Sequence, residues 1–257
     1  MALLLASARN VPQAHMALKN GKWERSKWEG VELHGKTISI VGLGRVGALV
    51  AQRCLAFGMR LVAYDPFVSA ERAQQMQVRL MQLPALFAEA DYVSLHLPRT
   101  PDTENLVNAE LLRTMKPTAR LVNCARGGIV DEAALAEAVE TGVIAGAALD
   151  VFQKEPTVDQ RLQNLPQVVA SPHIAASTRE GLARTNMIAA RNVVMALDGG
   201  EPLPRDCVVA DGRVSGILEL GGGFNPELTG RQNLMTAGIL NGLTPTEVKA
   251  REEKIIA

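Results

Sequence analysis

Short apolar runs alternate with amphipathic stretches along most of this chain. Several of the runs are apolar without interruption, which is typical of parallel strands covered on both faces. Stretches with helical periodicity lie between them, such as residues 48–57 and DEAALAEAVETG at residues 131–142. This alternation predicts an α/β fold with a doubly wound parallel sheet. The expected strands are residues 37–43, 60–64, 92–97, 120–124, 145–149 and 168–170.

The N-terminal stretch has the pattern of an amphipathic helix. Residues 3–20 place Leu18 on its apolar face, and Gly21 is suited to cap its end. Pro12 falls inside the pattern, so we expect the helix to be interrupted or kinked there. The opening ALLLASA resembles a signal peptide, but it lacks a basic n-region and its apolar run is short. We therefore predict that this stretch belongs to the mature fold.

The C-terminal stretch carries weaker signals. We expect one domain to span residues 1–198, and residues 199–257 to form a short irregular tail, a candidate remnant of a second domain. Residues 243–257 predict a short helix, with Thr244 and Glu247 as a capping box and Pro245 at its first position. No functional prediction follows from this tail.

Composition narrows the classes of partner. The 27 Lys and Arg residues balance 27 Asp and Glu residues, so no charge excess predicts a nucleic acid or an anionic membrane as partner. No apolar run approaches the roughly 18 residues of a spanning helix. The cysteines at positions 54, 124 and 207 are far apart, which predicts no metal site and favours the reducing cytoplasm.

A glycine-rich turn follows the strand expected at residues 37–43. Gly42, Gly44 and Gly47 form G-x-G-x-x-G, and Asp65 lies 23 residues after the first of them, at the end of the next strand. This context favours a dinucleotide site of the Rossmann type over a turn that serves packing alone. Asp65 would bond the ribose hydroxyls and repel a 2′-phosphate, and Pro66 rather than a basic residue follows it. The predicted cofactor is therefore NAD rather than NADP.

Three polar residues follow other expected strands: Arg126, Glu155 and His173. Ligands bind at the carboxyl ends of the strands in open α/β sheets, so these are candidate site residues. Each also has a structural interpretation, as a surface arginine, a solvated loop charge and a loop histidine with satisfied hydrogen bonds. Their spacing is too large for one helix face, so only the fold can bring them together.

Five stretches in order resemble the D-2-hydroxyacid dehydrogenases: TISIVGLGRVG, VSLHLPRTPDTENLV, LVNCARGGIVDEAAL, ALDVFQKEP and SPHIAAST. The resemblance extends from about residue 3 to about residue 198. It implies a nucleotide-binding domain that begins with its long arm helix. It also implies that the N-terminal half of the substrate domain is absent from this chain.

The resemblance implies a catalytic role for each of the three candidates. His173 would take the proton of the C2 hydroxyl as a hydride leaves C2 for the nicotinamide. Glu155 would pair with the imidazole and orient it. Arg126 would hold the substrate carboxylate and polarise the C2 oxygen, for which its planar guanidinium is suited.

The resemblance also implies the contacts of the cofactor. Asp150 would meet the nicotinamide carboxamide, and the backbone of Arg45 and Val46 would meet the pyrophosphate. Leu97, Cys124 and Ala176 would line the cofactor cleft, with no catalytic role for the thiol.

The substrate and the assembly are expectations from the same resemblance. The signatures are most similar to members that oxidise 3-phosphoglycerate, the first step of serine biosynthesis. A hydroxypyruvate or glyoxylate reductase, and a module that binds NAD(H) without catalysis, remain alternatives. The arm helix would pair with its twin in a homodimer, with Trp23 and Trp28 near the end of the arm.

Overall fold

The computed structural model describes residues 1–157, 160–198, 207–210 and 213–216. The chain divides into two units, residues 1–175 and residues 176–257, and each is considered by itself. The first unit contains the sheet and nearly all of the predicted site residues.

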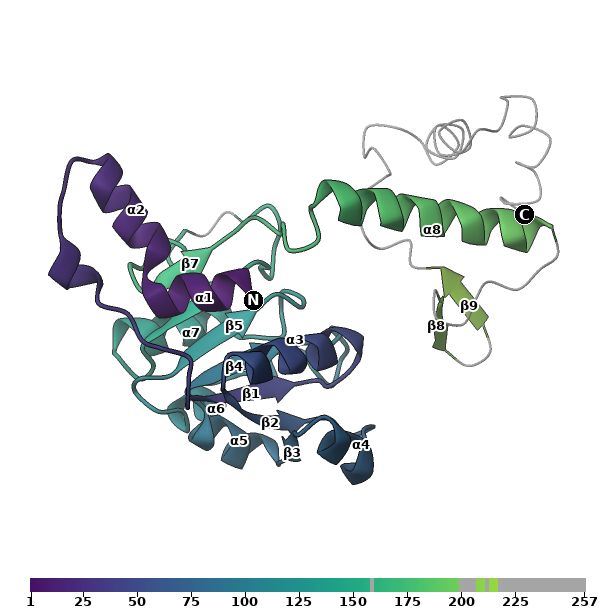
Figure 1. The fold of residues 1–257 in the computed structure, drawn as a ribbon, viewed down its shortest axis with the longest axis horizontal. Coiled ribbons are helices and arrows are strands. Elements are labelled where there is room, and N and C mark those ends of the chain that lie inside the picture. The colour runs from purple at the N-terminus through teal and green to yellow at the C-terminus, as the bar shows by residue number, and fades with distance from the viewer. Residues whose placement is uncertain (158–159, 199–206, 211–212, 217–257) are drawn as a thin grey trace. The chain divides into compact units, whose positions relative to one another are not determined.

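Seven parallel strands form one sheet in the first unit, in the order β3-β2-β1-β4-β5-β6-β7 (Figure 1). The order reverses between β1 and β4, which is the point where ligands bind in doubly wound sheets. Strands β1, β4 and β6 are buried at every position, as expected for parallel strands that are covered on both faces. The strands are β1 (Thr37–Val41), β2 (Arg60–Tyr64), β3 (Arg79–Leu80), β4 (Tyr92–Leu95), β5 (Arg120–Asn123), β6 (Gly146–Leu149) and β7 (Val168–Ala170).

The predicted doubly wound α/β fold is confirmed. Each of the six expected strands is present, and three of them (β1, β4 and β5) end one or two residues earlier than expected. Strand β3 is not among the strands expected from the sequence; it has only two residues and pairs with β2 at one edge of the sheet.

Helices cover both faces of the sheet, and each face has its own apolar core. On one face Leu4 and Ala8 of α1 and Ala51 and Cys54 of α3 pack against the strands. The core of the other face includes α5, α6 and α7. The helices of this unit are α1 (Ala2–Arg9), α2 (Val11–Lys19), α3 (Arg45–Ala56), α4 (Ala70–Gln75), α5 (Leu83–Glu89), α6 (Ala109–Arg113) and α7 (Glu132–Glu140), with a 3-10 turn, η1 (Arg25–Trp28).

The N-terminal helix is broken at Asn10 and not at Pro12. Asn10 has a left-handed backbone, with φ 51°, and it separates α1 from α2. Pro12 lies in the first turn of α2, where a missing N–H leaves no helical hydrogen bond unmade. Gly21, with φ 73°, follows α2 as expected, and Lys22 N–H donates to the Ala17 carbonyl across this end.

The second unit contains a long helix, α8 (Arg179–Leu197), and two antiparallel strands, β8 (Cys207–Ala210) and β9 (Arg213–Gly216). The sequence analysis did not predict these two strands. The helix expected at residues 243–257 lies outside the described residues, and the domain boundary at residue 198 stays a prediction. In the described part of the chain, no helix is both long enough and apolar enough to cross a membrane.

Candidate active site

The glycine turn lies between the end of β1 and the start of α3. A Cβ on Gly42 would lie 2.6 Å from the His96 carbonyl oxygen, and φ there is 93°. A Cβ on Gly47 would lie 2.0 Å from the Gly42 carbonyl oxygen, so this glycine lets α3 pack against the turn. A Cβ on Gly44 would meet nothing within 4 Å. Neighbouring backbone therefore leaves no space for a side chain at Gly42 and Gly47, whereas the space beside Gly44 is free. A pyrophosphate needs such free space beside the turn.

The N-terminus of α3 begins at this open side. Gly44 is its N-cap residue and supplies no side-chain hydrogen bond, and Arg45 and Val46 form the first helical positions. Val46 is 61% exposed, so the first turn of the helix reaches the surface. Backbone N–H groups and the positive end of the helix dipole make such a terminus suited to a phosphate.

Asp65 follows β2 and braces the same turn. Its Oδ2 accepts a hydrogen bond from Leu43 N–H at 2.7 Å, and its Oδ1 accepts one from Phe67 N–H at 2.9 Å. A carboxylate can accept about four hydrogen bonds, so these two leave capacity for ribose hydroxyls. The contact with the ribose stays a prediction, and the hydrogen bond of Asp65 to the glycine turn was not expected from the sequence.

Leu97 and Cys124 lie just beyond β4 and β5. A Cβ on Gly42 would lie 2.9 Å from Leu97 Cδ2, so Leu97 flanks the glycine turn at the reversal of strand order. Burial, and then the negative charge of Asp150, raise the pKa of the Cys124 thiol. A thiol that is harder to ionise is a poor nucleophile, which is consistent with a wall residue.

His96, directly after β4, was not singled out from the sequence. It is partly buried, and its Nε2 lies 2.9 Å from Ser94 Oγ. Burial lowers the pKa of its imidazole from 6.5 to about 4. The signal in the sequence was a histidine that ends a buried apolar strand.

We expect acid to destabilise the fold through His96. The folded chain favours the neutral ring, so this contribution is complete above pH 6.5 and is lost as pH falls from 6.5 to about 4. The loss amounts to on the order of 3 kcal/mol. Urea unfolding at about pH 7 and about pH 4, for the chain and for His96→Gln, measures it. An unchanged difference between the two pH values in His96→Gln would contradict the assignment to this residue.

The loop after β5 is shaped by Asn123. This buried side chain donates from Nδ2 to the Arg126 carbonyl at 3.1 Å and accepts from Ala125 N–H at 3.0 Å. Arg126 is exposed at the turn, and its Nη1 donates to the Ala125 carbonyl at 2.7 Å. Asn123 was missed from the sequence, although a polar residue at the end of a buried strand was the available signal.

Gly127 joins this loop to the one that carries Glu155. A Cβ on Gly127 would lie 1.8 Å from the Phe152 carbonyl oxygen and 2.7 Å from Gln153 N. The two backbones are therefore in direct contact at this glycine. Arg126 is placed beside the Glu155 loop by the backbone, while its guanidinium bonds within its own turn.

Glu155 and His173 form a hydrogen-bonded pair at the carboxyl edge of the sheet. His173 Nδ1 lies 2.7 Å from Glu155 Oε2, and the other carboxylate oxygen accepts from Phe152 N–H at 2.9 Å. The side chain of His173 is 43% exposed and that of Glu155 is 35% exposed, so both reach solvent. The residues are 18 apart in sequence and follow different strands, β6 and β7, so the fold brings them together.

The two other predicted cofactor contacts, Asp150 and Ala176, belong to different units. Asp150 directly follows β6 and is 1% exposed. Ala176 begins the second unit, so its place in a cofactor cleft stays a prediction.

Comparison with known proteins identifies the family to which this chain is similar. The family model described as D-isomer specific 2-hydroxyacid dehydrogenase, NAD binding domain, matches residues 1–175. The D-3-phosphoglycerate dehydrogenase of Synechocystis sp. is 52% identical over 180 residues, which cover 70% of this chain and 32% of that protein. The chain thus spans about a third of the length of this curated relative.

Two solved structures show the same arrangement of elements. A glyoxylate reductase from Paecilomyes thermophila matches with a TM-score of 0.73 and 31% identity, covering 78% of this chain and 61% of that one. The D-lactate dehydrogenase from Aquifex aeolicus, solved with NAD and lactic acid, matches with a TM-score of 0.71 and 30% identity, covering 77% and 64%.

Proposed function

We propose a function on the premise that this chain belongs to the D-isomer specific 2-hydroxyacid dehydrogenases and carries their NAD binding domain. The proposed reaction is the oxidation of a D-2-hydroxy acid at C2, with NAD as the hydride acceptor. The preferred substrate is 3-phosphoglycerate, which would place the chain in serine biosynthesis in the cytoplasm. The observation that carries this proposal is the contact of 2.7 Å between His173 Nδ1 and Glu155 Oε2.

The paired imidazole and carboxylate are suited to move one proton. A carboxylate accepts from Nδ1–H, so the other ring nitrogen, Nε2, is left to take the proton of the C2 hydroxyl. The negative charge of Glu155 stabilises the imidazolium that results. Arg126, at the neighbouring loop, holds the substrate carboxylate with its guanidinium. The C2–H bond breaks as the O–H bond does, and the product is the 2-keto acid.

The chain's glycine turn and acids fit the cofactor that the family implies. When bound, NAD supplies the carbon that accepts the hydride from C2. The open side of the turn at Gly44 would receive the pyrophosphate beside the backbone of Arg45 and Val46, and Asp65 would bond the ribose hydroxyls. Asp150 would contact the carboxamide, and Leu97 and Cys124 would line the cleft.

Substrate oxidation by the chain tests the proposal. NAD and 3-phosphoglycerate are supplied, and NADH is followed by its near-ultraviolet absorbance. The reduction of glyoxylate by NADH is measured in a separate assay, because a glyoxylate reductase is among the similar structures. A higher kcat/KM for 3-phosphoglycerate supports the proposal, and a higher value for glyoxylate overturns the substrate. NAD binding without turnover of either substrate would favour a binding module.

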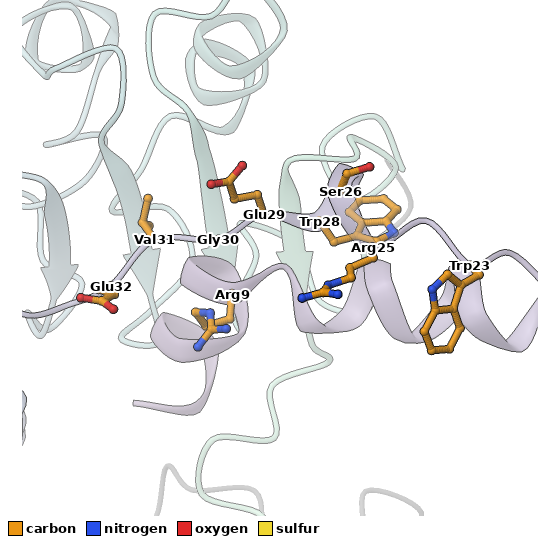
Figure 2. Close-up of a pocket in the computed structure, with 9 residues that line it drawn as sticks. All are labelled: Arg9, Trp23, Arg25, Ser26, Trp28, Glu29, Gly30, Val31 and Glu32. Carbon is orange, nitrogen blue, oxygen red and sulfur yellow. The ribbon is translucent and has the colours of Figure 1, made fainter.

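We also propose that the arm pairs with a second copy of the chain. Met16 and Leu18 on α2 are each 57% exposed, and Trp23 is 82% exposed. Trp23 borders a hollow of about 750 Å³ whose lining comes from the end of α1, from the segment after α2, and from η1 and the stretch that follows it (Figure 2). Exposed aromatic and apolar side chains such as these three are typical of protein interfaces. The hollow beside Trp23 is lined mainly by charged and polar residues, with Trp28 and Val31 among them.

We expect the chain to sediment as a dimer and the variant Trp23→Ser to dissociate at concentrations where the chain does not. The change removes the largest exposed apolar surface of the arm and leaves the sheet untouched. Analytical ultracentrifugation over a range of concentrations measures both. Phe67→Ser is the control, since Phe67 is 95% exposed beside β2. A chain that stays monomeric throughout would refute the proposal.

A further inference from the structure

We propose that Asp150 is a positioning residue, which holds the turn at His173 so that the imidazole meets Glu155. This inference rests on the proposed function, in which His173 moves the proton. It goes beyond the cofactor contact predicted for Asp150, because it assigns this carboxylate a role in the geometry of the acid/base pair.

Asp150 makes four hydrogen bonds with the stretch that carries His173. Its carbonyl accepts from His173 N–H at 2.8 Å. Its Oδ1 accepts from Ser171 Oγ at 2.6 Å and from Ile174 N–H at 2.9 Å, and its Oδ2 accepts from Ala175 N–H at 2.8 Å. Donors on both sides of His173 therefore converge on one residue that is 1% exposed. Hydrogen bonds that an ionised carboxylate accepts are about twice as strong as those between neutral groups.

His173 needs this support because its backbone is strained. Its φ is 52°, in the left-handed region, which costs a residue with a Cβ about 1–2 kcal/mol. The side chain is 43% exposed, so burial of the ring contributes little to holding it. Left-handed turns direct successive N–H groups to one side, where an anion can bind them. Here the anion is the Asp150 carboxylate, and its hydrogen bonds offset the cost of the left-handed backbone at His173.

The turn in turn fixes the direction of the imidazole. Glu155 is held from its own loop, because its Oε1 accepts from Phe152 N–H. The ring can meet Oε2 only if the backbone of His173 stays in the observed conformation. Asp150 thus acts through the turn and touches neither ring nitrogen. A carboxylate oxygen accepts up to two hydrogen bonds, so the Ala175 bond at Oδ2 is compatible with a carboxamide contact.

The substitution Asp150→Asn tests this role. It keeps the shape of the side chain but places an NH₂ group where backbone N–H groups or the Ser171 hydroxyl must be accepted. The readout is the ¹⁵N chemical shifts of the His173 ring, which report the nitrogen that carries the proton. In the chain we expect mainly the Nδ1–H form, because Glu155 accepts at Nδ1. In Asp150→Asn we expect this form to become the minority, as in a free imidazole, which prefers Nε2–H.

Matched variants separate positioning from general structural damage. Asp102→Asn makes the same change at an exposed site and should leave the ring as it is. Glu155→Ala removes the acceptor itself and sets the spectrum expected for full loss of the pair. Asp150→Asn that is folded by circular dichroism and keeps the Nδ1–H form would overturn the proposal.

If Asp150→Asn does not fold, Ser171→Ala tests the positioning role of Asp150. It removes one donor to Oδ1 and leaves the buried charge in place. A measurable rise of the Nε2–H form supports the proposal, and an unchanged ring overturns it. These measurements need neither substrate nor NAD. The proposed oxidation can therefore fail its own test while the positioning role stands, and the reverse also holds.

Discussion

Replacing His173 with alanine should lower kcat for the proposed oxidation of 3-phosphoglycerate by about 100- to 10,000-fold, because it removes the group proposed to take the hydroxyl proton. Glu155 would keep its bond to Phe152 N–H, so the loop after β6 should stay in place. NAD affinity should change little, since the glycine turn and Asp65 lie at the ends of β1 and β2. Initial rates and a fluorescence titration with NAD measure the two quantities.

A neighbouring variant provides the comparison for His173→Ala. Lys154→Ala removes an exposed charge from the same loop as Glu155, and we expect it to keep kcat within about threefold of the chain. If His173→Ala retained more than about a tenth of kcat, the proposal that this imidazole takes the proton would be wrong. If NAD affinity fell as far as kcat, the loss would belong to cofactor binding and not to the chemical step.

The sheet could be predicted from the sequence because its strands are buried on both faces. The run at residues 60–64 predicts β2 with its observed ends, since the apolar pattern and the core coincide there. Strand β3 has two residues, and Arg79 in it is exposed, so no apolar run marks it. The break in the arm was placed at Pro12 because proline is the usual interruption. The helix is interrupted at Asn10 instead, because its short polar side chain tolerates the left-handed conformation.

The members of the site could be predicted, but their contacts could not. The ends of predicted strands indicate Arg126, Glu155 and His173, because such ends gather at one edge of the sheet. The distance between Glu155 and His173 depends on two loop conformations that no periodicity encodes. The bonds of Asp150 depend on a positive φ at His173, and no neighbouring glycine signals it. Local backbone geometry thus decides what the strand pattern leaves open.

Replacing Gly127 with alanine should destabilise the fold by about 3 kcal/mol or more. The added Cβ would lie 1.8 Å from the Phe152 carbonyl oxygen and 2.1 Å from its carbon, and both are backbone atoms that cannot rotate away. The smaller entropy of an unfolded chain with alanine would return only about 0.4–1 kcal/mol. The midpoint of urea unfolding, followed by circular dichroism, measures the net change.

Gly44→Ala separates this collision from the general effect of replacing glycine. A Cβ at Gly44 meets nothing within 4 Å, so we expect the unfolding midpoint to stay near that of the chain while NAD affinity falls. An unfolding midpoint for Gly127→Ala equal to that of Gly44→Ala would show that the two loops are not in contact. If the collision is real, any folded fraction of Gly127→Ala must hold the Arg126 loop away from Phe152, whose N–H anchors Glu155. The stability of the fold and the geometry of the Glu155–His173 pair therefore both depend on a glycine at position 127.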